Sequence, residues 1–275
     1  MTTPVTDHYT SGDLLDRLRA ALRQDGVDPD RPTLADLAPY DQFHGRGLEA
    51  TEELAATLDI AASDHVLDVG SGIGGPARLI ADRFGCRVTG IDLTPEFCAV
   101  ARHITRLVGL DSRVVFEQGD ALAMPFAAGT FDGAYSLNVA MNIADKPGFY
   151  REIHRVLKPK AWVVLAEIGL GPGAPVEFPT PWAATAEASF LATPEATRLG
   201  LEAAGFAVTA WRDTLRETLA YNARMRAAVE RGEKSPQRVV QLVHGDRAAQ
   251  ASANIARGLA EGGLIPIEIR CRKRD

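Results

Sequence analysis

The sequence predicts an α/β fold built around a mostly parallel sheet. Its central part alternates short apolar runs, typical of buried strands, with longer amphipathic stretches, typical of helices. This alternation gives parallel strands joined by right-handed crossover connections. A glycine-dense turn ends the first apolar run and an acidic residue ends the second, so a ligand is expected at the carboxyl ends of the strands.

The expected strands and helices follow from these runs. Five strands are expected in the central part, at residues 65–70, 87–92, 114–119, 131–137 and 161–168. Helices are expected between them at residues 75–84, 95–109 and 146–157. Thr193 can cap a further helix, which Gly205 ends. Two last strands, at residues 206–211 and 265–272, complete a sheet of seven.

Helical stretches also lie outside this core. Apolar residues recur at helical spacing in residues 14–23 and 48–58, separated by a stretch rich in Pro and Asp at 28–39. About fifty residues separate the last two expected strands, and structureless loops of that length are uncommon in compact domains. We therefore expect a helical insertion there, which forms a lid over the strand ends together with the N-terminal helices.

The composition is that of an ordinary globular protein. Hydrophobic residues make up 46% of the 275-residue chain and charged residues 24%. No apolar stretch approaches the ~20 residues that cross a membrane, and no signal-peptide pattern is visible, so a cytoplasmic protein without a membrane partner is expected. Three scattered cysteines and six histidines without ligand spacing predict no metal site.

The charge balance argues against a polyanionic partner. The formal net charge is −6, whereas nucleic-acid-binding proteins usually carry a basic patch or stripe. The expected partner is therefore a small molecule and not a nucleic acid. A homodimer is left open.

The turn after the first strand carries the ligand prediction. It reads Gly70-Ser71-Gly72-Ile73-Gly74-Gly75, and glycine lets a backbone approach a ligand closely because it has no Cβ. Asp92, about twenty residues later, is placed to accept hydrogen bonds from a ribose diol. Gly70, Gly72 and Gly75 also satisfy the dinucleotide pattern G-x-G-x-x-G, so a nicotinamide cofactor is one interpretation.

Two features favour a cofactor without phosphate. Asp68 lies inside the first strand, where a carboxylate suits a positively charged amino group better than a pyrophosphate. A third acidic strand end, Asp120 followed by Ala121, is placed to grip an adenine edge. No lysine or arginine stands ready to bind phosphate. S-adenosylmethionine (SAM) fits this description.

These residues also carry a family resemblance. Residues 65 to 168 resemble a class I SAM-dependent methyltransferase, most closely the small-molecule enzymes of the sarcosine/dimethylglycine, sterol and tocopherol type. The matching pieces are Leu67–Gly75, Gly90–Leu93, Gly119–Ala121, Met124–Phe126, Phe131–Asp132 and Arg155–Pro159. The resemblance implies a Rossmann-like, seven-stranded, mostly parallel sheet. It divides the chain into an N-terminal helical lid (1–60), a SAM-binding core (61–212) and an insertion with the final strand (213–275).

The resemblance also points to particular site residues. The expected cofactor-binding set is Asp68, Gly70, Ser71, Gly72, Gly74, Asp92, Leu93, Asp120, Ala121, Asn138 and Gln42. The expected catalytic set is Asn138, His44 and Tyr9. Many relatives carry Gln-His where this chain has Leu137-Asn138, and an amide can orient an acceptor but cannot act as a base at neutral pH. Plainer roles are a turn-stabilising Asn138, a helix-entry His44 and a packing Tyr9.

The expected function is methyl transfer from SAM to a small organic acceptor. Transfer to nitrogen is slightly favoured, with an amine or an amino acid such as sarcosine or dimethylglycine as acceptor. Arg224, Arg226 and Arg238 of the insertion are candidates to hold the carboxylate of such an acceptor. Alternatives are C- or O-methylation of a hydrophobic natural product, a nicotinamide-dependent oxidoreductase, and a SAM-binding protein without catalysis.

Overall fold

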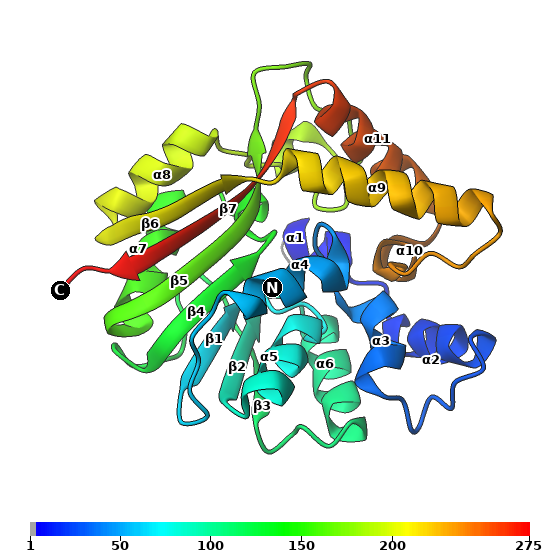
Figure 1. Cartoon of the computed structure of the whole chain (residues 1–275), viewed down its shortest axis with the longest axis horizontal. Coiled ribbons are helices and arrows are strands. Elements are labelled where there is room, and N and C mark those ends of the chain that lie inside the picture. Colours follow the sequence, from blue (N-terminus) through cyan, green and yellow to red (C-terminus); the bar gives the residue numbers. More distant parts are fainter. Residues whose placement is uncertain (1–3) are drawn as a thin grey trace.

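The sheet has the predicted architecture. The computed structural model describes residues 4–275, and within them seven strands lie in the order β3-β2-β1-β4-β5-β7-β6 (Figure 1). The strands are β1 (His65–Val69), β2 (Arg87–Asp92), β3 (Val114–Gln118), β4 (Phe131–Leu137), β5 (Leu157–Leu170), β6 (Phe206–Asp213) and β7 (Leu264–Lys273). The first five pair in parallel, and β7 runs antiparallel to both β5 and β6. The prediction of a mostly parallel sheet of seven strands is confirmed.

Helices cover both faces of the sheet because successive strand residues point to opposite sides. On one face α4 (Gly47–Ala56), α5 (Gly75–Phe84) and α6 (Pro95–Leu107) pack against Val66 and Val88. On the other face α7 (Lys146–Val156) and α8 (Pro194–Ala203) pack against Leu67 and Val163. The core is therefore a three-layer sandwich whose strand ends stay open on one edge.

The N-terminal helices are α1 (Pro4–Tyr9), α2 (Leu14–Gln24) and α3 (Leu34–Asp41). Helices α2 and α3 pack against α6, where Leu18 and Leu37 contact the cluster around Ile104. The stretch rich in Pro and Asp at residues 28–39 is helical in its second half, because Thr33 and Asp36 form a capping box that begins α3 despite Pro39.

One buried ion pair fastens this region to the core. The guanidinium of Arg78 on α5 is fully buried and donates to Asp41 Oδ2 at 2.8 Å. It also donates to the carbonyl of Ile73 at 2.8 Å and to Thr105 Oγ1 at 2.9 Å. Removing one partner of such a pair leaves a buried, uncompensated charge, so the end of α3 is firmly attached to the glycine turn.

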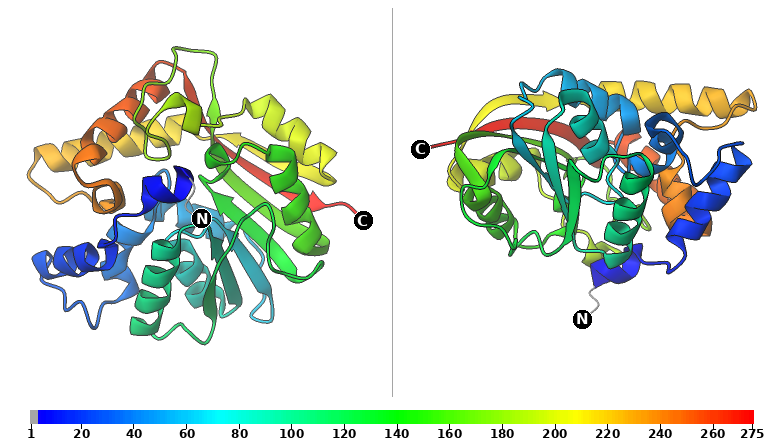
Figure 2. Two further views of the ribbon diagram at one scale, coloured as in Figure 1. Left: turned by 180° about the vertical axis from the view of Figure 1, so that it is seen from behind. Right: turned by 90° about the horizontal axis from the view of Figure 1, so that it is seen from below.

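The segment between β6 and β7 is helical, as predicted. It contains α9 (Leu215–Glu230), α10 (Val239–His244) and α11 (Ala248–Ala260). Figure 2 shows these helices and the N-terminal ones gathered at one end of the molecule, beyond the strands. A long connection over residues 171–192, between β5 and α8, approaches the same end. No helix of residues 4–275 has the length and apolar character needed to cross a membrane.

Candidate active site

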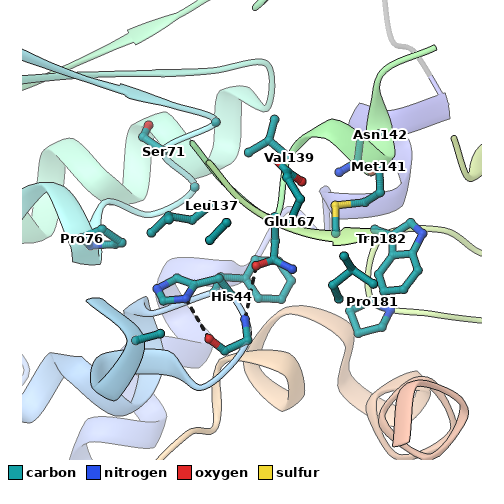
Figure 3. Close-up of a pocket in the computed structure, with 18 of the residues that line it drawn as sticks. His44, Ser71, Pro76, Leu137, Val139, Met141, Asn142, Glu167, Pro181 and Trp182 are labelled. Carbon is teal, nitrogen blue, oxygen red and sulfur yellow. Dashed lines mark hydrogen bonds between the residues drawn. The ribbon is translucent and has the colours of Figure 1, made fainter. Parts of the chain in front are cut away.

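A cavity of about 700 Å³ lies at the carboxyl ends of the parallel strands, which is a usual size for a small-molecule site. Its glycine-turn end consists of Asp68, Gly70, Ser71, Gly72, Asp92, Leu93, Asp120 and Ala121. Its far end consists of Tyr9, Met141, Asn142, Pro181, Trp182, Ile255 and Leu259. Figure 3 shows Ser71 and Pro76 on one side, Pro181 and Trp182 on the other, and Val139 and Glu167 between them.

The glycines of the turn are present for different structural reasons. Gly70, Gly72 and Gly74 all have positive φ, at 76°, 52° and 84°. A Cβ on Gly70 would lie 2.2 Å from Val139 Cγ2, and one on Gly74 would lie 2.3 Å from Phe116 Cζ, so both are required for packing. A Cβ on Gly72 would meet no atom within 4 Å. Gly72 therefore leaves an open cradle on the cavity side, whereas Gly74 does not line the cavity.

Asp92 is fixed by the backbone around it. Its Oδ2 accepts from the N–H of Gly72 and its Oδ1 from the N–H of Thr94, both at 2.8 Å. Burial raises the pKa of its carboxyl, while these two bonds favour the charged form. Asp120 is exposed and accepts from the N–H of Leu122 at 2.8 Å, so its turn-capping role coexists with a place on the cavity wall.

Asp68 is a buried carboxyl with one hydrogen-bond donor. It is 2% exposed, and Oδ2 accepts from the hydroxyl of Tyr135 at 3.0 Å. Burial raises the pKa of Asp68 to about 8. A positively charged group placed beside it would favour the carboxylate and compensate its burial. Nearby, the hydroxyl of Ser71 is buried with no partner in the protein, so the turn retains unused hydrogen-bonding capacity.

The glycine-turn end has no free basic side chain, among the described residues, that could bind a phosphate. Among the described residues that line the cavity, Arg46 is the only lysine or arginine. Its guanidinium is already bound to Glu53, with N–O distances of 2.9 and 2.7 Å. Three carboxylates around an open glycine cradle fit a nucleoside cofactor with a cationic amino group, and they do not fit a pyrophosphate.

Two predicted residues, His44 and Gln42, support the wall of the cavity, and neither provides a free base. His44 lines the cavity, with Nε2 2.9 Å from Thr51 Oγ1 and Nδ1 3.1 Å from the carbonyl of Gly45. Burial lowers the pKa of His44 to about 4, so its imidazole is neutral and both nitrogens have partners. Gln42 is buried behind it and accepts from Thr51 Oγ1 at 2.7 Å. Gln42 does not line the cavity.

Asn138 lies at the tip of β4, on the cavity wall. It adopts a left-handed conformation, with φ of 57°, which Asn tolerates better than most residues. Its Oδ1 accepts from the N–H of Gly45 at 3.5 Å. The amide thus joins the loop after β4 to the segment that carries His44, and it combines the turn role with a position at the cavity.

Tyr9 joins the first helix to the far end. Its hydroxyl donates to Asn142 Oδ1 at 3.3 Å, and its ring packs against Phe43 and Phe97. Burial raises the pKa of the phenol, so Tyr9 stays protonated. Helix α1 therefore covers the cavity and contacts the loop after β4 directly.

Several far-end residues carry no sequence signal. Pro181 and Trp182 lie on the connection after β5, and Ile255 and Leu259 lie on α11. Glu167 has one signal that sequence reasoning missed, since it is the acidic residue within the apolar run 161–168. The suggestion that insertion arginines hold an acceptor is wrong, because none of them lines the cavity. Arg224 pairs with Glu49 at the surface, Arg226 is exposed, and Arg238 pairs with Asp25 over the ring of Tyr40.

Comparison with known proteins agrees with this architecture. A family model described as a methyltransferase domain matches residues 67–165. The chain is 37% identical over 131 residues to phosphoethanolamine N-methyltransferase 1 of Triticum aestivum, which covers 48% of this chain and 26% of that protein. It is 42% identical over 106 residues to sterol 24-C-methyltransferase of Eremothecium gossypii, which covers 38% of this chain and 28% of that protein.

A solved structure extends the likeness of the fold to the whole chain. The geranyl diphosphate C-methyltransferase of Streptomyces coelicolor, in complex with S-adenosyl-L-homocysteine, aligns with a TM-score of 0.70. The alignment covers 99% of this chain and 100% of that chain at 18% sequence identity. The chain therefore has the fold of the class I SAM-dependent methyltransferases, and its residues 67–165 match a methyltransferase domain.

Proposed function

We propose that this protein transfers a methyl group from SAM to a nitrogen of a small organic acceptor. One observation carries the proposal: a carboxylate-lined glycine cradle without a free cation opens into the same cavity as an apolar far end. Such a cavity can hold a cationic nucleoside cofactor and a second small molecule side by side. The chain covers about a quarter of the length of the two curated relatives, so activity and acceptor are proposed here for this chain alone.

The proposed cofactor contacts follow from where each group lies. Asp92 is proposed to accept from a ribose diol, Asp68 to attract the amino group, and Asp120 with Ala121 to contact the adenine edge. Gly72 provides the close approach, and Leu93, Gly70 and Ser71 complete the wall. When bound, SAM supplies a methyl group that its sulfonium has already activated.

The rest of the chemistry is alignment and exclusion of water. Good orientation of two reactants can lower a barrier by ~7–11 kcal/mol. Asn138 is proposed to orient the acceptor, while Tyr9 and Asn142 close the cavity over it. His44 is proposed to shape the wall, since both its nitrogens already have partners.

Transfer to nitrogen is favoured because the described lining of the cavity offers carboxylates, and its one histidine, His44, already has partners on both nitrogens. A neutral amine needs no strong base, and its methylated, positively charged product suits an acidic lining. The second candidate is C-methylation of a hydrophobic compound, which the apolar far end supports. The relatives include proteins named for both chemistries, phosphoethanolamine N-methylation and sterol C-methylation.

Calorimetry with SAM and S-adenosylhomocysteine (SAH) tests the cofactor. Binding of both is expected, and failure of both at high micromolar concentration would overturn the proposal. Quenching of NADH fluorescence would instead support an oxidoreductase. Release of labelled methyl to a panel of amines, phenols and sterols then separates N- from C-methylation. Tight SAH binding with no transfer to any member would favour a non-catalytic SAM-binding protein.

A further inference from the structure

The far end of the cavity is built from carbon-rich side chains. The lining there comes from five separate parts of the chain: α1, the segment after α3, the loop after β4, the connection over residues 171–192, and the insertion. Its apolar members include Phe43, Met141, Trp182, Val240, Ile255 and Leu259. Burying apolar surface of a ligand there is favourable by roughly 25 cal/mol per Å². The body of the acceptor is therefore expected to be apolar.

No cation is available at this end to bind an acidic head group. Arg46, the single basic side chain among the described lining residues, is held by Glu53 and lies 3.5 Å from Glu49. The neighbouring Lys146 donates instead to the carbonyls of Ile143 and Phe190. A phosphate or carboxylate would enter this cavity without a partner, at a large desolvation cost.

Glu167 is the group that stands between the two ends. Its side chain lines the cavity and is 95% buried, since it is only 5% exposed. Oε2 accepts from the N–H of Ala140 at 3.1 Å, while Oε1 has no hydrogen-bond partner in the protein. Figure 3 shows the side chain close to Val139, on the path from the glycine turn to Asn142. Capping the Ala140 turn occupies Oε2, so Oε1 is the oxygen of this buried carboxylate that has unused hydrogen-bonding capacity.

The surroundings of Glu167 suit a cation. Burial raises its pKa to about 8, whereas the backbone N–H groups of Ala140 and Val139 and the ammonium of Lys146 favour its charged form. Tyr150, on the same helix as Lys146, is a further titratable group that interacts electrostatically with Glu167. A ligand nitrogen that donates to Oε1 would satisfy the orphaned oxygen and compensate the buried charge. A ligand phosphate at the same place would meet a like charge.

We propose that Glu167 is the specificity-determining residue of this cavity, and that the acceptor is an apolar amine without a phosphate or carboxylate group. The inference rests on the proposed function, because it assigns the acceptor that this function leaves open. Oε1 of Glu167 binds the ammonium of the acceptor and would take up its proton, so that the neutral nitrogen can accept the methyl group of bound SAM as the C–S bond breaks and SAH leaves. The apolar far end holds the rest of the molecule. Phosphorylated acceptors are excluded.

A matched set of head groups on one chain tests this directly. We would titrate n-octylamine, n-octanol and n-octyl phosphate into the protein at pH 8 by calorimetry, with and without SAH. Octylamine is expected to bind at least about tenfold more tightly than octyl phosphate, and Glu167→Gln is expected to remove about tenfold of the octylamine affinity. The octanol affinity of that variant should stay within about threefold, because the amide can still accept from Ala140.

Two further variants serve as controls. Glu268→Gln changes another buried carboxyl of the same lining, but one already paired with Arg270 at 2.8 Å, so the head-group preference should persist. Glu167→Asp keeps the charge and should retain the preference for amine over phosphate even if Glu167→Gln does not fold.

The outcomes separate this inference from the proposed function. The role of Glu167 would be overturned if octyl phosphate bound as tightly as octylamine. It would also be overturned if Glu167→Gln lost as much affinity for octanol as for octylamine. Failure of SAH to bind, with the amine preference intact, would instead overturn the methyltransferase assignment and leave the amine site standing.

Discussion

The two ends of the cavity are built in different ways. The glycine-turn end comes from the tips of three neighbouring parallel strands, and much of its shape is set by backbone: positive φ angles, N–H groups and missing Cβ atoms. The far end comes from α1, the connection after β5 and α11, which are distant in sequence. The glycine-turn end, proposed to hold the cofactor, is therefore a local property of the fold. The far end, proposed to hold the acceptor, depends on side chains that only tertiary packing brings together.

The largest effects are expected from substituting two glycines, which tests whether the backbone shapes the glycine-turn end. Gly70→Ala puts a Cβ 2.2 Å from Val139 and adds left-handed strain, so the free energy of unfolding should fall by about 2–4 kcal/mol in urea denaturation. Gly72→Ala fills open space and should cost about 1–2 kcal/mol of stability, but it should weaken SAH binding strongly. If both variants lost only stability, the cradle at Gly72 would not be a ligand surface.

The next effect concerns the carboxylate at the tip of β2. Asp92→Ala removes a charged acceptor and should weaken SAH binding by about 1.5–3 kcal/mol in calorimetry. Trp182→Phe, a change confined to the far end, should leave SAH affinity nearly unaltered. Equal losses of SAH affinity in the two variants would contradict the assignment of the cofactor to the glycine-turn end alone.

A pH dependence follows from Asp68. Its pKa of about 8 means that few molecules carry the carboxylate at pH 7, so binding a cation there releases a proton. SAH affinity should rise about eightfold between pH 7 and pH 8.5, then level off, and Asp68→Asn should remove this rise. A wild-type affinity that is flat over this range would contradict the proposed contact with the amino group.

The same carboxyl also sets a trend in the stability of the ligand-free protein. Because the pKa of Asp68 is raised above its unfolded value, its contribution is fully present below about pH 4 and is lost as pH rises through about 8. Glu167 is shifted in the same direction. Asp68→Asn should therefore reduce, but not abolish, the fall in unfolding free energy between pH 5 and pH 8.

The smallest expected effect belongs to the far end. Tyr9→Phe removes one hydrogen bond to Asn142 and keeps the ring contacts, so stability should fall by about 0.5–1.5 kcal/mol. A double-mutant cycle with Asn142→Ala should recover a coupling of that size. SAH affinity should hold within about twofold. A loss comparable to that of Asp92→Ala would show that α1 also shapes the glycine-turn end.

Most of the fold could be predicted because its signals are local. The βα alternation located all seven strands, and the capping residue Thr193 located the start of α8. The start of β5 was predicted four residues late, because its pairing with β4 continues across a register shift to Leu157. The capping box at Thr33 was a readable signal that the nearby prolines obscured.

The site could be predicted only in part, for the same reason. Asp68, Asp92 and Gly72 lie at strand tips, so the order of strands brings them together. Trp182 sits on a connection with no periodicity, and only tertiary packing places it in the cavity. Gln42 shows the reverse case: its position in the sequence suggested a ligand contact, but its side chain turns inward to Thr51.

The buried pair between Arg78 and Asp41 limits how this molecule can admit its ligands. The end of α3 cannot move away without leaving two unpaired charges in an apolar interior, so residues 4–60 do not move as one unit. Helix α1 is attached at the far end through hydrogen bonds of Tyr9 to Asn142, at 3.3 Å, and of His8 to the carbonyl of Pro181, at 3.1 Å. Entry and exit are then expected to require displacement of a single short helix, while the scaffold that holds the nucleoside stays still.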